Sequence, residues 1–98
     1  MLAFSLPRMT LKIETASDGK TATLRLSGRI DEEHLTELDA ELRRYRLRLA
    51  FDLAEATLVD QMVVRFLAAR EAEGVELRHC PRYIREWIHR ERRDPEVQ

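Results

Sequence analysis

The chain is poor in cysteine, glycine and proline, and it has no long run of apolar residues. Cys80 is the one cysteine among 98 residues, so no disulfide can form within the chain. Three glycines and three prolines leave no composition for a flexible linker. The longest apolar runs, such as residues 66–69, have four residues, too few to cross a bilayer. The opening residues also lack the basic segment of a signal peptide. We therefore expect a cytoplasmic protein with no membrane insertion.

An excess of charge of one sign is missing as well. The 17 lysines and arginines nearly balance the 18 aspartates and glutamates, which gives a net charge of −1. A general nucleic-acid or membrane binder needs a net basic field, so neither class is expected. The apolar fraction of 44% and the length are those of one globular domain with one core.

Alternating apolar and polar residues predict two strands near the start of the chain. Leu11, Ile13 and Thr15 alternate with polar residues, and residues 22–27 repeat this pattern. Asp18-Gly19 is a turn signal between the two segments. We expect an antiparallel hairpin that turns around residues 17–20.

Apolar residues at helical spacing predict three helices. The first follows Asp31, the second runs from Asp60 to Gly74, and the third begins at Pro81. Asp31 and Asp60 are N-cap candidates, Gly74 is a C-terminal stop, and proline suits a first helical position. The predicted apolar faces are, in chain order, Leu35, Leu38, Leu42 and Tyr45; Met62, Val63, Phe66 and Leu67; and Ile84, Trp87 and Ile88.

The segments between these helices complete the predicted fold. Residues 47–53 have the apolar-rich composition of a central strand, residues 55–58 are predicted as a loop, and residues 75–79 as a further strand. The order β-β-α-β-α-β-α predicts an α/β domain with a mixed four-stranded sheet and helices packed against it. We place the domain at residues 11–91, between an N-terminal extension (1–10) and a frayed tail (92–98).

Several short segments are similar to those of a known family. Residues 24–31 (LRLSGRID) resemble the second strand and following turn of STAS domains, the fold of bacterial anti-sigma-factor antagonists. Residues 49–53 and 56–60 resemble the central strand of that family and the loop before its second helix. Residues 80–88 also resemble the ending of a group of small bacterial STAS-like proteins. The resemblance implies a STAS-like fold and a role in partner switching.

The resemblance also places a phosphorylation switch where this chain differs. In typical members a serine, phosphorylated by a partner kinase, follows the aspartate that corresponds to Asp60. Here Gln61 stands at that position, and glutamine neither accepts a phosphoryl group nor mimics its charge. Thr57 is the nearest hydroxyl, and small hydroxyls in loops usually bond the local backbone. We expect the usual serine switch to be absent.

The candidate partner-binding surface surrounds the start of the second helix. It comprises Asp31, Glu32, Thr57, Asp60, Gln61, Met62 and Arg65. The alternative is that Asp60 only caps the helix and that Gln61 is solvated. Likewise, the acidic stretch of residues 31–41 is either a docking patch or a solvated helix face. We expect charge reversal of Asp60 and Arg65 together to abolish partner binding and leave the fold intact.

Other chemistry has weaker support in the sequence. Cys80 precedes a helix start, where a lowered pKa would make a reactive thiol, although a lone cysteine is more often a small buried apolar residue. No catalytic set and no zinc-ligand spacing is found, so we predict no enzyme, no metal and no cofactor. The arginine-rich last helix lacks interleaved aromatic residues, which argues against nucleic acid.

These observations lead to one functional hypothesis and one alternative. The hypothesis is a non-catalytic, STAS-like protein–protein interaction module in bacterial signalling or regulation, whose partner is an anti-sigma factor, a kinase-like regulator or another signalling protein. The alternative is a self-associating structural subunit, for example a homodimer, or an accessory subunit of a transporter.

Overall fold

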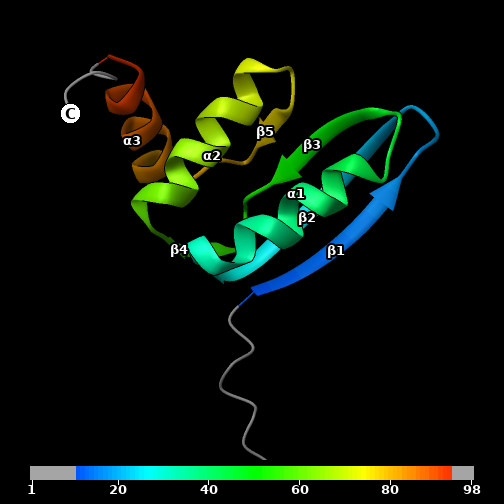
Figure 1. The fold of residues 1–98 in the computed structure, drawn as a ribbon, viewed down its shortest axis with the longest axis horizontal. Helices are drawn as coiled ribbons and strands as arrows, with labels where there is room; N and C mark the ends of the chain where they lie inside the picture. The colour runs from blue at the N-terminus through cyan, green and yellow to red at the C-terminus, as the bar shows by residue number, and fades with distance from the viewer. Residues whose placement is uncertain (1–10, 94–98) are drawn as a thin grey trace, which may run out of the picture.

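The computed structural model describes residues 11–93, which form a mixed sheet with helices packed against it (Figure 1). The predicted N-terminal extension, residues 1–10, lies outside the described residues, as do residues 94–98. The elements are, in chain order, β1 (Leu11–Ser17), β2 (Thr21–Ile30), the 3-10 helix η2 (Glu32–His34), α1 (Leu35–Arg43), β3 (Arg48–Asp52), β4 (Ala56–Val59), α2 (Gln61–Ala72), β5 (Glu76–Arg78) and α3 (Arg82–Arg93). The predicted α/β class and single-domain organisation are confirmed.

The long strand β2 organises the sheet. It pairs antiparallel with β1, from Leu11 opposite Gly28 to Ser17 opposite Ala22, and this confirms the predicted hairpin. The Asp18 carboxylate closes the turn because it accepts hydrogen bonds from the backbone N–H groups of Lys20 and Thr21, both at 2.8 Å. The other edge of β2 pairs parallel with β3, which in turn pairs parallel with β5.

The sheet has five strands, one more than predicted. The additional strand is β4, in the segment predicted as a loop, and it pairs parallel with the C-terminal part of β2. Strands β3 and β4 therefore follow the same edge of β2 one after the other. The register shifts between Gly28 and Arg29, and Gly28 adopts a positive φ of 93° that a side chain would disfavour. This irregularity brings the end of β4 beside the end of β2.

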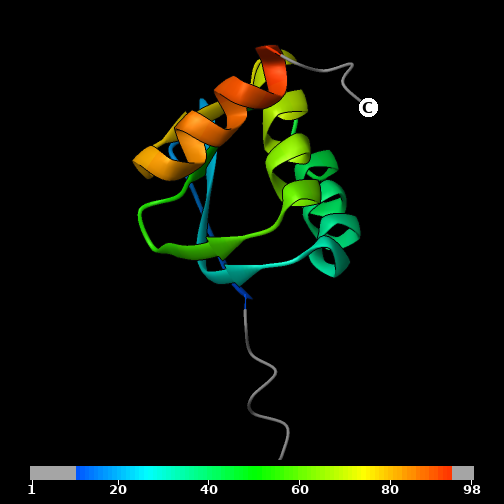
Figure 2. The same ribbon diagram turned by 90° about the vertical axis from the view of Figure 1, so that its left-hand side faces the viewer.

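The helices cover one face of the sheet, as Figure 2 shows, and the core lies between them. Ala22, Leu24 and Leu26 of β2 point into this core and are fully buried. Helix α1 contributes the predicted Leu38 and Leu42, and α3 contributes the predicted Ile84 and Ile88. No described helix has the length and apolar character needed to cross a membrane.

Helix α2 presents a different face to the core from the predicted one. Its buried residues are Val63, Val64 and Leu67, whereas Met62 is exposed and Phe66 is only partly buried. Asp60 caps the start of the helix as predicted, and Gly74 follows its last turn with a φ of 109°. The helix is thus rotated so that Met62 points away from the packed interior.

The opposite face of the sheet is polar. Arg25 in β2 lies 3.9 Å from carboxylates on both sides, Glu14 of β1 and Asp52 of β3. Arg78 of β5 donates to the Thr23 hydroxyl at 3.2 Å. Cross-strand pairs of opposite charge suit a solvated sheet surface, so this face needs no further layer of structure.

Helix α3 extends further than predicted. Arg92 and Arg93, which were assigned to the frayed tail, belong to its last turn. Arg92 donates to the backbone oxygen of Ala68 at 3.1 Å and to the Glu71 carboxylate at 3.0 Å, so contacts with α2 hold this end of the helix.

Candidate partner-binding site

Asp60 holds two helix starts together. Its Oδ1 accepts a hydrogen bond from the Val63 N–H at 2.9 Å, which caps α2. Its Oδ2 accepts one from the Glu32 N–H, also at 2.9 Å, at the start of η2. Both N–H groups lie in first helical turns and have no partner within their own helix, so one carboxylate satisfies donors from two elements. Asp60 is therefore a structural residue at the centre of the predicted surface.

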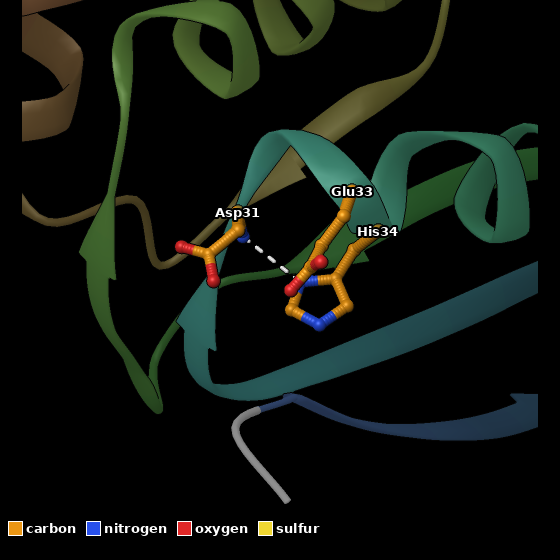
Figure 3. A group of neighbouring side chains, drawn as sticks. All are labelled: Asp31, Glu33 and His34. Carbon is orange, nitrogen blue, oxygen red and sulfur yellow. Dashed lines mark hydrogen bonds between the residues drawn. The ribbon is translucent and has the colours of Figure 1, made fainter. Parts of the chain in front are cut away.

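Asp31 and His34 form a second cap beside this link (Figure 3). The backbone N–H of Asp31 donates to His34 Nδ1 at 2.9 Å, and the N–H of His34 donates to the Asp31 carbonyl oxygen at 2.9 Å. The Asp31 carboxylate points away from the imidazole ring and lies 3.4 Å from Arg29 Nε. The predicted helix start at Asp31 is confirmed, although its first turn is a 3-10 helix.

Asp31, Glu33 and His34 are also the group of described residues with metal-ligand spacing. One ligand atom from each lies within 4.8 Å of the others. However, Nδ1 of His34 already accepts the Asp31 N–H, and the Arg29 guanidinium occupies one side of the Asp31 carboxylate. A positive charge and a used ligand atom both disfavour a cation here, so the geometry fits a helix cap better than a metal centre.

Gln61 and Arg65 converge on Glu91 of α3. Gln61 Nε2 donates to Glu91 Oε2 at 3.2 Å, and Arg65 Nε donates to Glu91 Oε1 at 3.1 Å. These hydrogen bonds, first that of Gln61 and then that of Arg65, lower the pKa of Glu91 below its ordinary value. Both predicted residues therefore join the start of α2 to the end of α3.

Three large apolar side chains are exposed in β4 and at the starts of α2 and α3. Among the described residues, the exposed large hydrophobic side chains are Leu58 (53% exposed), Met62 (42%) and Tyr83 (44%). Leu58 belongs to β4 and Met62 to the first turn of α2. The Tyr83 hydroxyl donates to the carbonyl oxygen of Thr57 at 3.1 Å, which places the start of α3 against β4. The three residues therefore belong to adjoining segments.

The structure joins the predicted surface residues through a few side chains that the sequence did not identify. Asp60 connects to Glu32, and Glu91 connects Gln61 to Arg65. Leu58, Tyr83 and Glu91 were absent from the predicted set. An apolar residue within the predicted loop was a signal for Leu58. The contacts of Tyr83 and Glu91, in contrast, cross 26 and 30 residues of sequence.

Cys80 packs against the core as a partly buried residue. Burial raises the pKa of its thiol above the ordinary value, and the attraction of Arg85 offsets this only in part. A helix start would lower the pKa, so the direction opposes the reactive-thiol alternative and favours a small apolar residue.

The acidic stretch of residues 31–41 has two parts. Towards its end, Asp39 lies 2.9 Å from Arg43 and 3.6 Å from Arg70 of α2, and Glu41 lies 3.3 Å from Arg44. At its start, Glu32, Glu33 and Glu37 are exposed, and none of these side chains forms an ion pair within residues 11–93. The docking-patch interpretation is therefore restricted to this first part.

Some of the arginines of α3 bond an acidic residue of α2 and so have a structural role. Arg85 makes two hydrogen bonds with Glu71 of α2, at 2.9 and 3.0 Å, and Arg92 adds a third to the same carboxylate. These bonds, above all that of Arg85, lower the pKa of Glu71. Glu71 therefore fastens α3 to α2, and Arg85 and Arg92 serve the fold.

Among known proteins, the chain is similar to solved structures. No family model and no curated protein sequence matches the chain. The chain is similar to an antisigma-factor antagonist, a STAS domain from Rhodobacter sphaeroides, with 24% sequence identity and a TM-score of 0.49. The alignment covers 69% of this chain and 80% of that chain. A likeness of this size concerns the arrangement of the backbone and does not assign a function.

Proposed function

We propose that this chain is a non-catalytic interaction module that binds a protein partner in bacterial signalling or regulation, in the manner of an anti-sigma-factor antagonist. The partner would be an anti-sigma factor, a kinase-like regulator or another signalling protein in the cytoplasm. The proposed contact area is the β4–α2 surface, which we define as Thr57, Leu58, Gln61, Met62, Arg65 and Tyr83. The similarity of residues 24–31 and 56–60 to STAS segments is the sequence support for this class.

The observation that carries the proposal is the position of the exposed apolar side chains. Leu58, Met62 and Tyr83 are about half exposed. Leu58 lies in β4, Met62 lies in the first turn of α2, and the Tyr83 hydroxyl bonds the neighbouring Thr57 of β4. Burying a large apolar side chain completely contributes about 1.5–3 kcal/mol, so half-exposed ones leave part of this free energy for a partner. Apolar anchors beside polar groups such as Gln61 and Arg65 are typical of protein interfaces.

The same surface supports binding that does not depend on serine phosphorylation. Gln61 is neutral and donates a hydrogen bond to Glu91. No serine or threonine occurs between Leu58 and Arg70. The Thr57 carbonyl accepts the Tyr83 hydroxyl, while the Thr57 side chain is exposed. We therefore propose that the partner recognises the apolar and amide groups of this surface, and that the surface does not alternate between phosphorylated and unphosphorylated forms.

The test is affinity capture from the source organism with a variant that changes only this surface. Leu58→Ser with Met62→Ser makes the surface polar and leaves Asp60 in place, so both helix caps remain. The matched control is Lys12→Ser with Glu14→Ser, two exposed residues on the opposite face of the sheet. We expect a stoichiometric partner on wild type and control, identified by mass spectrometry, and its loss from L58S/M62S.

Two outcomes would contradict the proposal. Retention of the same partner by L58S/M62S and by the wild type would place the binding surface elsewhere. Capture of no protein by wild type or control would remove the support for a partner-binding module. Asp60 and Arg65, the pair first chosen for charge reversal, are unsuitable here because Asp60 caps two helices and Arg65 bonds Glu91.

A further inference from the structure

We infer that copies of this chain associate through unlike charged faces, the η2–α1 segment of one copy against the outer side of α3 in the next. The acidic face comprises Glu32, Glu33 and Glu37. The basic face comprises Arg82, Arg90 and Arg93. The proposed partner is thus a second copy of the chain, and neither face shares a residue with the β4–α2 surface.

The carboxylates of the acidic face form no ion pairs among the described residues. Glu32, Glu33 and Glu37 are exposed, and no side-chain hydrogen bond or ion pair within residues 11–93 involves their carboxylates. No lysine or arginine occurs between residues 31 and 41. Clustered like charges repel one another, and an opposite charge brought to them removes that repulsion.

The basic face is the counterpart on α3. This helix carries five arginines against two glutamates. Arg85 and Arg92 are used by Glu71, but Arg82, Arg90 and Arg93 are exposed and form no ion pair with another described residue. Arg90 and Arg93 also line a surface hollow of about 260 Å³, together with Arg85, Glu86 and His89. The hollow has three arginines against the single carboxylate of Glu86, so it offers guanidinium groups to an incoming carboxylate.

Several features favour a second copy over another acidic partner. The acidic face carries three carboxylates and the basic face carries three guanidinium groups, so the two faces of successive copies are complementary in charge. A net charge of −1 gives little overall repulsion between copies. In Figure 2, α1 and α3 lie on either side of α2, and α2 contacts α1 through Arg70 and Asp39 and α3 through Arg85 and Glu71. The two faces are therefore separate and can be occupied at once.

Nucleic acid is a poorer occupant of the basic face. A phosphate backbone would meet a chain of net negative charge, and the acidic face would repel it. This inference does not rest on the proposed function. The proposed function concerns the β4–α2 surface and a separate partner protein, whereas the charged faces bind a second copy of this chain.

The first test is the molar mass of the purified full-length chain, measured by light scattering as salt and protein concentration vary. The Debye length falls from about 30 Å at 0.01 M salt to about 3 Å at 1 M, so contact between exposed charges should weaken steeply. We expect masses well above the 11.5 kDa of one chain at low salt and a return to that value at high salt. A mass of one chain at every salt and protein concentration would overturn the inference.

Charge exchange provides the second test. Arg90→Glu with Arg93→Glu makes both faces acidic, and Glu33→Arg with Glu37→Arg makes both basic. We expect each variant alone to stay at the mass of one chain, and an equimolar mixture to associate, because every contact in it joins opposite charges. The control K12E/E14R exchanges an ion pair on the opposite face of the sheet and should behave as the wild type.

Circular dichroism of each variant separates loss of association from misfolding, because oppositely charged unfolded chains can also attract each other. A mixture that remains at the mass of one chain, or a single variant that associates as strongly as the wild type, would overturn the inference. Both tests use only the purified chain, so their failure leaves the capture experiment with Leu58 and Met62 unaffected.

Discussion

Replacing Asp60 with alanine should destabilise the domain more than a surface substitution normally does. The change removes the acceptor of the Val63 N–H at the start of α2 and the acceptor of the Glu32 N–H at the start of η2. Alanine offers no replacement, and neither donor has a partner within its own helix. Two elements separated by 28 residues in sequence also lose their direct link.

The magnitude follows from these two hydrogen bonds. Loss of an N-cap aspartate costs about 1 kcal/mol of unfolding free energy. The bond to Glu32 lies at the surface, where water can solvate the released N–H, so its loss adds about 1 kcal/mol rather than the full penalty of a buried donor. We expect about 2 kcal/mol for Asp60→Ala. Asp60→Asn should lose about 1 kcal/mol, because asparagine caps as well as aspartate but has only one acceptor oxygen.

Urea unfolding of the purified variants, followed by circular dichroism, measures these differences. With an m-value of about 1–3 kcal/mol/M, Asp60→Ala should lower the midpoint by about 1 M urea. Glu32→Ala is the matched control because it keeps the N–H that bonds Asp60, and it should stay within about 0.5 kcal/mol of the wild type. Equal midpoints for wild type and Asp60→Ala would refute the reasoning, and equal midpoints for the alanine and asparagine variants would refute the double role of the carboxylate.

Two further predictions concern Glu71 and Cys80. The pKa of Glu71 is lowered in the folded state, chiefly by Arg85, so its contribution to stability is present above its unfolded pKa and is lost as the pH falls through the folded value. The urea midpoint of the wild type should therefore fall below a pH of about 4.5 more steeply than that of Glu71→Gln, and parallel curves would contradict this. Burial raises the pKa of Cys80, so a maleimide at neutral pH should label the native chain more slowly than the urea-unfolded chain. Equal rates would show an accessible thiol.

Most of the fold could be predicted because its signals are local. The alternation in β2 follows from a strand with one buried face, where Leu24 and Leu26 are fully buried and Arg25 is exposed. The start of α2 was equally readable, since an aspartate before an apolar helical pattern is a cap signal and Asp60 caps it. Each of these features depends on a few neighbouring residues.

Strand β4 could not be predicted in the same way. Its four residues have the burial order buried, exposed, exposed, buried, which does not alternate. It forms only because β2 continues past β3 and leaves its edge available, with a register shift at Gly28. This pairing is non-local, so residues 56–59 read as a loop when taken alone. The missing strand also explains why Leu58 was overlooked as a surface residue.

The sequence grouped some residues of the candidate site, but it did not predict their contacts. The sequence placed Asp60, Gln61 and Arg65 together because they are neighbours in one helix start. Their partners Glu32 and Glu91 lie 28 residues before and 30 residues after, and only tertiary packing brings them there. Met62 was assigned to the apolar face, whereas Val64 occupies the core instead. The buried face of α2 is shifted by about one residue position around the helix axis from the predicted face, and this shift leaves Met62 exposed.

Near the start of α2, some side chains bond within the fold and others are exposed without such bonds. This difference decides which residues can be changed to test the function. Asp60 uses both carboxylate oxygens within the fold, and the Arg65 side chain bonds Glu91, so variants at either residue remove contacts between elements. The side chains of Leu58 and Met62 form no hydrogen bond or ion pair among residues 11–93, and both are about half exposed. We therefore expect a partner that binds this surface to contact Leu58 and Met62. Loss of binding without loss of stability is expected at these two positions, whereas variants of Asp60 should lose both together.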